Sequence, residues 1–248
     1  MGGQSGLGQN LYVGGYNLSS DVGAINDAGG PRPSLPVTAL NASGVERLLG
    51  LGDGHISFNT WFDDGTNLSH TALSSLPTTD TQALYVAGTA AGDKAAGLVC
   101  KQVGYNWSRN NDGSLQGTIE CVSSSGNPLE WGEMLTSATD THTGATNGTS
   151  RDDTAQTTGG LRAYLQVFAL TGTNVVVTIE ESNDNGSGDA WTAKLAFTSV
   201  TSVPGKERKT GTGTVERYLR LATSGTFSSA EFAVMTARGT ANDDVPLA

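Results

Sequence analysis

The fold is decided by residues 37–62, VTALNASGVERLLGLGDGHISFNTWF. The run starts as a strand. Ser43 and Glu46 then fit a capping box, with serine at the N-cap and glutamate three residues later. The apolar residues that follow share one helical face, so we predict a short helix over residues 43–49. The last part alternates apolar and polar residues and ends in aromatic residues, which is typical of a strand.

Most of the remaining chain is predicted to be β-structure. Glycine occupies 34 of the 248 residues, roughly double its usual share of ~7%, and favours tight turns. The turn signal Asn110-Asn-Asp-Gly113 predicts a hairpin between strands at residues 97–105 and 114–123. A second short helix is predicted over residues 70–76, ended by Pro77.

The chain is predicted to have two β domains. Residues 136–160 contain almost no large apolar side chain, which indicates a linker. Strands are predicted after it at residues 161–170, 175–181, 193–199, 214–223 and 230–238. Strands at this spacing indicate a β-sandwich. We therefore expect a mainly β protein with one β domain over residues 1–135, a linker, and a β-sandwich domain over residues 161–248.

Charge and hydropathy exclude two classes of partner. The net charge is −10, and most of the acidic excess lies in the first 150 residues. No basic stripe is present to neutralise phosphates, so we expect no binding of nucleic acid. No stretch approaches the ~20 apolar residues of a membrane span, and the N-terminus lacks the apolar core of a secretory signal. We expect no membrane partner.

The sequence shows no catalytic or metal-binding motif. His55, His70 and His142 are far apart and none has the spacing of a metal-ligand pair. No serine occupies a G-x-S-x-G elbow, and no phosphate-binding glycine motif occurs. We therefore predict a protein that is not an enzyme, with no catalytic residue, no metal and no cofactor.

Three weaker patterns each have a structural and a functional interpretation. Asn183, Asp184 and Asp189 could supply oxygen ligands to calcium, but a solvated hairpin is the favoured interpretation. Cys100 and Cys121 could approach across the predicted hairpin, and two free buried thiols are favoured over a disulfide. Glu216, Arg217 and Arg220, with Arg162, form either an intersubunit salt-bridge surface or an ordinary charged face.

The first half of the chain resembles the tail tube (major tail) proteins of long-tailed bacteriophages. The resemblance covers about residues 10–135. It is carried by residues 37–40, 43–49, 52–58 and 61–62, the hairpin 97–105/114–123, and residues 125–132. It implies a β-sandwich with one flanking helix whose copies assemble into stacked rings around a DNA-sized lumen. The second half resembles β-sandwich modules appended to phage virion proteins, or is a second, diverged tube unit.

The resemblance implies a structural virion protein that self-assembles into the tail tube, a conduit for DNA. Its partners would be copies of itself in hexameric or trimeric pseudo-hexameric rings, and other tail proteins, with DNA passing unbound. It would be made in the host cytoplasm and located in the virion tail. The candidate contacts between subunits are Pro31, Pro33, Trp61, Phe62, Arg217 and Arg220.

Two other functions remain open from sequence. One is a capsid decoration or carbohydrate-binding β-sandwich protein of a virion, with Trp61, Trp107 or Trp191 stacking on sugar and Asp63 and Asp64 as hydrogen-bond partners. The other, a hydrolase with a triad assembled only by folding, has no supporting motif.

Overall fold

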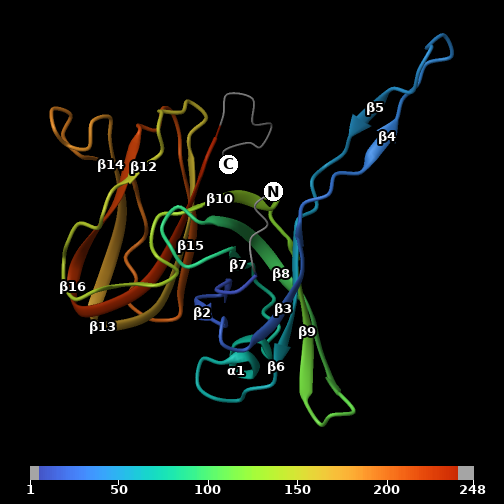
Figure 1. Cartoon of the computed structure of the whole chain (residues 1–248), viewed down its shortest axis with the longest axis horizontal. Coiled ribbons are helices and arrows are strands. Elements are labelled where there is room, and N and C mark those ends of the chain that lie inside the picture. Colours follow the sequence, from blue (N-terminus) through green and yellow to red (C-terminus); the bar gives the residue numbers. More distant parts are fainter. Residues whose placement is uncertain (1–5, 240–248) are drawn as a thin grey trace.

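The computed structural model describes residues 6–239 and is built almost entirely from β-strands (Figure 1). In this part of the chain the single helix is α1 (Ser69–Leu73). The described strands form one 14-stranded sheet and a separate two-stranded hairpin. The predicted mainly β fold with one short helix is confirmed.

The first lobe comprises residues 6–134. Its strands are β1 (Asn10–Val13), β2 (Tyr16–Asn17), β3 (Val22–Gly29), β4 (Ser34–Pro36), β5 (Arg47–Leu49), β6 (His55–Trp61), β7 (Thr81–Val86), β8 (Lys94–Arg109), β9 (Leu115–Ser123) and β10 (Glu130–Met134). The long strand β8 belongs to both layers of this lobe, because its first half pairs with β7 and its second half with β9. One layer contains the strands β3, β6, β9 and β8 in this order, and the other contains β8, β7, β1 and β2.

One apolar core joins the two layers of the first lobe. Strand alternation sends every second side chain inward, so Ile56 and Phe58 of β6 and Ile119 of β9 are fully buried. They share a cluster with Leu11 of β1 and with Leu73, the last residue of α1. The helix is therefore held by this core, as its short length requires.

The second lobe, residues 135–239, is organised by two very long strands. Its strands are β11 (Asp140–His142), β12 (Arg151–Asp152), β13 (Leu161–Ser182), β14 (Thr192–Ala196), β15 (Gly205–Gly211) and β16 (Tyr218–Arg238). β13 and β16 pair along almost their whole length and curve together around their own core (Figure 1). The curved pair requires glycine at position 172. Gly172 has a φ of 148°, and a Cβ there would lie only 2.4 Å from the Cα of Phe227.

β10 joins the two lobes through backbone hydrogen bonds. It pairs with β8 from Glu130↔Gly97 to Glu133↔Lys94, and with β16 at Glu133↔Thr236 and Met134↔Met235. A third apolar cluster lies at this junction, with Tyr12 and Leu84 from the first lobe against Tyr164 and Met235 from the second. The sheet is therefore continuous from one lobe to the other.

A buried charge cluster reinforces the junction. The carboxylate of Glu130 accepts hydrogen bonds from Arg208 Nε and Nη2, both at 2.8 Å, and from the Tyr164 hydroxyl at 2.6 Å. Arg162 Nε lies 3.3 Å from the same carboxylate. Burial, and next the charge of Glu130, raises the pKa of Tyr164 well above its usual value, so this hydroxyl remains a donor.

Three sequence predictions are corrected by these strands. The helix predicted over residues 43–49 is wrong, because β5 occupies the end of that range. The helix that forms is α1, which overlaps the second predicted helix at 70–76. The strands predicted at 161–170 and 175–181 are two halves of β13, and those at 214–223 and 230–238 fall largely within β16. β15 was not predicted, because its sequence GKERKTG is polar and has no apolar alternation.

The predicted linker, residues 136–160, contains two strands that are part of the second lobe. Both β11 and β12 pair with β16. The division of the chain into two domains at this segment stays a prediction. None of the helical structure described is long and apolar enough to cross a membrane.

The hairpin predicted around Asn110–Gly113 is confirmed as β8 and β9. Cys100 and Cys121 meet across it as free thiols, both fully buried. Hydrogen bonding to Cys100, followed by burial, raises the pKa of Cys121 well above its usual value, so this thiol is protonated at neutral pH.

Candidate assembly interface

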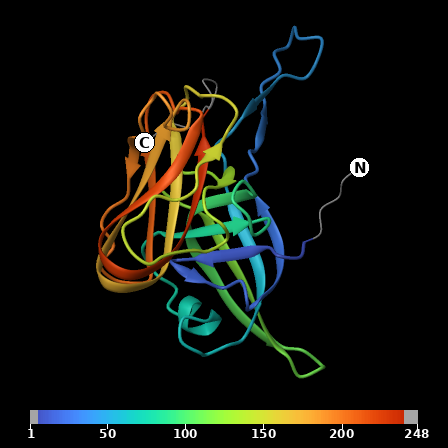
Figure 2. The same cartoon turned by 60° about the vertical axis from the view of Figure 1, so that its left-hand side comes forward.

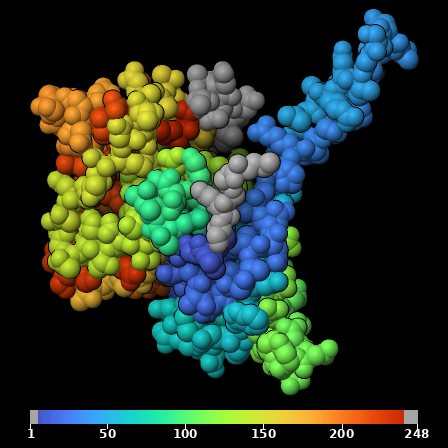
Figure 3. Space-filling model, in the orientation of Figure 1, coloured from blue at the N-terminus to red at the C-terminus, as the bar shows by residue number. Residues whose placement is uncertain are grey.

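A hairpin arm, residues 30–53, projects from the first lobe. Its strands β4 and β5 pair from Ser34↔Leu49 to Pro36↔Arg47. Below them the amide of Gly50 donates to the carbonyl of Pro33 at 2.7 Å. Figures 1 and 2 show the arm extending away from both lobes, and in Figure 3 it stands clear of the molecular surface.

The arm presents large aliphatic side chains to solvent. They are Leu35, Val37, Leu40, Val45, Leu48, Leu49 and Leu51. Leu51 is 91% exposed and Leu40 is fully exposed. A two-stranded hairpin by itself is marginally stable in water, and exposed apolar side chains gathered in one place mark interaction sites. The arm therefore has the properties of a segment that another molecule covers.

The layer β3–β6–β9–β8 has two open edges. Within the described residues, β3 pairs only with β6. β8 pairs with β7 as far as Cys100, and from there to Arg109 only with β9. Open strand edges carry unpaired backbone donors and acceptors, which can pair with a strand of another chain. Register shifts, such as the one between Gln102 and Gly104, interrupt both edges.

The outer face of this layer is polar. Asn26 of β3 donates to Asn59 of β6 at 2.9 Å, and the hydroxyl of Thr118 of β9 donates to the same Asn59 oxygen at 3.1 Å. His55 Nε2 and the carboxylate of Asp27 are hydrogen-bonded at 2.8 Å on the same pair of strands. This face is suited to contact with water, whereas the opposite face of the layer forms the core.

An aromatic cluster supports the far end of the β8–β9 hairpin. Phe62 lies 4.8 Å from the ring of His70 and 5.1 Å, edge-on, from that of Trp107. Tyr105 lies 5.4 Å from Trp107, and its hydroxyl is hydrogen-bonded to His70 Nδ1. Burial raises the pKa of Tyr105. Phe62 is thus engaged in packing that holds the hairpin against the body.

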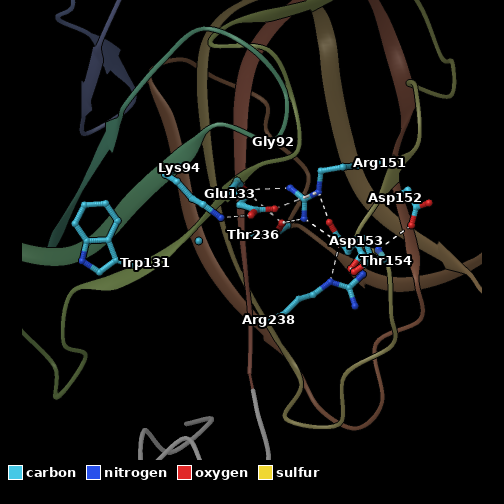
Figure 4. A pocket seen from close by; sticks show the side chains of 11 residues that line it. Gly92, Lys94, Trp131, Glu133, Arg151, Asp152, Asp153, Thr154, Thr236 and Arg238 are labelled. Atoms are coloured by element: carbon cyan, nitrogen blue, oxygen red, sulfur yellow. Dashed lines mark hydrogen bonds and ion pairs between the residues drawn. The ribbon is translucent and has the colours of Figure 1, made fainter. Parts of the chain in front are cut away.

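A hollow of about 660 Å³ opens at the junction of the lobes, beside β10. Figure 4 shows charged side chains from β8, β10, β12 and β16 gathered around it, with Trp131 at one end. Arg151 and Arg238 both bind the carboxylate of Asp153 there, with contacts of 2.6 and 2.7 Å.

The six contacts predicted from sequence fall in separate places. Pro31 and Pro33 lie exposed at the base of the arm. Trp61 ends β6 and remains 42% exposed, and Phe62 follows it.

The two predicted arginine contacts bind within the chain. Arg217 pairs with Asp152 at 2.6 Å and lies over the ring of Tyr218. Arg220 pairs with Glu180 at 2.8 Å and lies 4.3 Å from the ring centre of Trp191. Their role between subunits stays a prediction.

The histidines and the acidic loop have local structural partners. His142 is buried, 2.8 Å from the hydroxyl of Thr223. The carboxylate of Asp184 accepts backbone N–H groups from residues 187–189, so its oxygens are already used. In residues 6–239, no group of His, Cys, Asp and Glu side chains is arranged to hold a metal ion.

The sequence matches no protein-family model and none of the curated proteins compared with it. Among solved structures it is similar to a chain of the virion of a native gene transfer agent particle, with a TM-score of 0.41 and 12% identity, over 52% of this chain and 98% of that one. It is also similar to the Dit protein of phage SPP1, described as a paradigm of the hub adsorption apparatus in phages that infect Gram-positive bacteria (TM-score 0.34, 13% identity, 93% of this chain and 99% of that one). A third similar chain belongs to the phage p2 baseplate in its activated conformation with strontium (TM-score 0.34, 9% identity, 93% and 98%).

Proposed function

We propose that this chain is a structural protein of a bacteriophage tail, whose copies assemble into rings that stack into a tail tube. The observation that carries the proposal is the arm, residues 30–53, whose exposed aliphatic side chains have no cover within the described chain. Burial against a neighbouring copy removes this apolar surface from water and stabilises the hairpin.

The open edges support closure into a ring. The β3 edge of one copy and the second-half edge of β8 on the next can pair, so that the four-stranded layers of successive copies continue into one another. The same heterologous contact repeated around an axis gives a closed ring. The polar outer face, with Asn26, Asn59 and Thr118, then faces water on one side of the closed layer.

The charge of the chain is consistent with a conduit for DNA. A net charge of −10 repels phosphates, so a duplex inside such a tube would pass without binding. The proposal assigns no catalytic residue and no cofactor.

The test is the assembly state of the full chain and of an arm variant. Light scattering and negative-stain microscopy should show rings or tubes of uniform bore for the wild type. The variant Leu48→Ser/Leu49→Ser should remain a folded protomer. Leu76→Ser removes an aliphatic side chain that is 44% exposed outside the arm, and serves as the matched control that should still assemble.

Three outcomes separate the parts of the proposal. A wild type that stays a protomer at every concentration contradicts it entirely. An arm variant that assembles like the wild type removes the arm from the interface. Rings that never stack keep the ring but contradict the tube.

A further inference from the structure

The hollow beside β10 has one wall made by a row of three side chains. Glu133 of β10 lies opposite Lys94 of β8, and Trp131 is two residues earlier on β10. Because side chains alternate along a strand, Trp131, Glu133 and Lys94 point to the same face, which is the face toward the hollow (Figure 4). The Trp131 side chain is 54% exposed, and Tyr85 meets it edge-on at 6.5 Å.

The opposite wall is charged, but its charges are already bound. Arg151 uses all five of its N–H donors, on Asp153, on the Thr236 hydroxyl and on the carbonyls of Glu133 and Met134. Arg151 therefore offers no free N–H group to an anion.

The other arginine and the other acid of this wall are also paired. Arg238 donates to Asp153 and to three backbone carbonyls. Asp152 accepts both hydrogen bonds of Arg217. Lys94 and Glu133 pair with each other through Lys94 Nζ and Glu133 Oε1. The groups left to meet a ligand are therefore the Trp131 face, the other N–H donors of the Lys94 amine and the second carboxylate oxygen of Glu133.

We propose that this hollow binds a neutral saccharide. One face of a pyranose ring carries C–H groups that pack on the electron-rich face of an indole, which Trp131 supplies. The hydroxyls at the ring edge both donate and accept. Glu133 can accept from them and Lys94 can donate to them, with the strength of charge-assisted hydrogen bonds. The hollow, at about 660 Å³, lies within the ~300–1,000 Å³ range of small-molecule sites.

The site lies within one copy of the chain and does not depend on the proposed assembly. Binding is therefore measured on the full-length chain by saturation-transfer difference NMR. The probes are glucose, galactose, mannose, rhamnose and N-acetylglucosamine. We expect transfer to at least one sugar, strongest at the protons of one ring face.

Three variants identify the site. Trp131→Ala should weaken binding about tenfold or more, as loss of a central aromatic anchor does. Trp131→Phe should retain part of the affinity, and Glu133→Gln should weaken binding without changing the contacted ring face. Trp191→Phe alters a tryptophan that packs on Arg220 outside the hollow, and should bind like the wild type. Circular dichroism confirms that each variant is folded.

Three results would overturn the inference. The first is no transfer to any of the five sugars, or equal transfer in wild type and Trp131→Ala. The second is tighter binding of glucose 6-phosphate than of glucose, which would show that the site selects an anion. The third is binding of a peptide of residues 30–53 at Trp131 that is tighter than the binding of any of the five sugars, which would make the hollow a docking site for the arm of another copy.

Discussion

Neutralising the buried carboxylate of Glu130 should destabilise the fold more than most single substitutions do. Glu130→Gln keeps the side-chain shape but removes the negative charge that Arg208 binds through two hydrogen bonds and that lies 3.3 Å from Arg162 Nε. The side chains of Arg162 and Arg208 are only 7% and 9% exposed, so water cannot compensate. Breaking a buried pair by removing one partner costs about 3–5 kcal/mol, a large part of the ~5–15 kcal/mol that stabilises a typical domain.

The assay is urea unfolding followed by tryptophan fluorescence and circular dichroism. With an m-value near ~3 kcal/mol/M, the expected loss lowers the midpoint by about 1–2 M. Asp152→Asn is the matched control, because the Asp152–Arg217 pair is 40% and 42% exposed and solvent-exposed ion pairs contribute little to stability.

A further variant distinguishes the free-energy cost of breaking the buried ion pair from the cost of lost packing. Glu130→Leu combined with Arg162→Met and Arg208→Met removes all three charges and should recover most of the stability. The reasoning is refuted if Glu130→Gln costs no more than Asp152→Asn. It is also refuted if the triple variant is as unstable as the single one.

Three further outcomes are expected. Gly97→Ala should cost about 1–3 kcal/mol in urea, because its Cβ would lie 2.6 Å from the ring of Tyr164, and an unchanged midpoint would show that the ring moves freely. The Cys121 thiol should react with dithiobis(nitrobenzoate) only after unfolding, and rapid labelling of native protein would contradict its burial. Lys101 and two serines hold the pKa of Asp80 well below its usual value, so its contribution to stability is full above about pH 4 and is lost as the pH falls below that value. Asp80→Asn should therefore flatten the acid limb of a plot of urea midpoint against pH, and an unchanged limb would exclude this carboxylate as a cause.

Local signals in the sequence predicted several of the longer strands. The Asn-Asp-Gly turn located the β8–β9 hairpin, because that turn type needs few residues and no distant partner. Alternation located β6 and, in the second lobe, β13, β14 and β16 for the same reason.

The helix prediction over residues 43–49 failed for a physical reason. A two-turn helix persists only when its apolar face is packed on other structure. In the arm, Leu48 and Leu49 face solvent, so the capping signal of Ser43 and Glu46 has no packing to support it. The helix that does form, α1, is the one whose last residue, Leu73, is buried in the core.

The hollow could not be predicted from sequence. Trp131 was noted only as part of residues 125–132, which carried the family resemblance, and Asp152 and Asp153 lay in a segment interpreted as a linker. Their approach depends on β10 and β12 both pairing with β16, from positions far apart in the chain.

The bridge made by β10 also limits how this gene can change. Exchange of the second half for an unrelated sandwich, by recombination after residue 135, would remove the partners of Glu133 and Met134 on β16 and the cation that neutralises Glu130. A foreign half would have to restore both the strand register and Arg208 to be tolerated. We expect the two halves to have been inherited as a single unit, without shuffling between them.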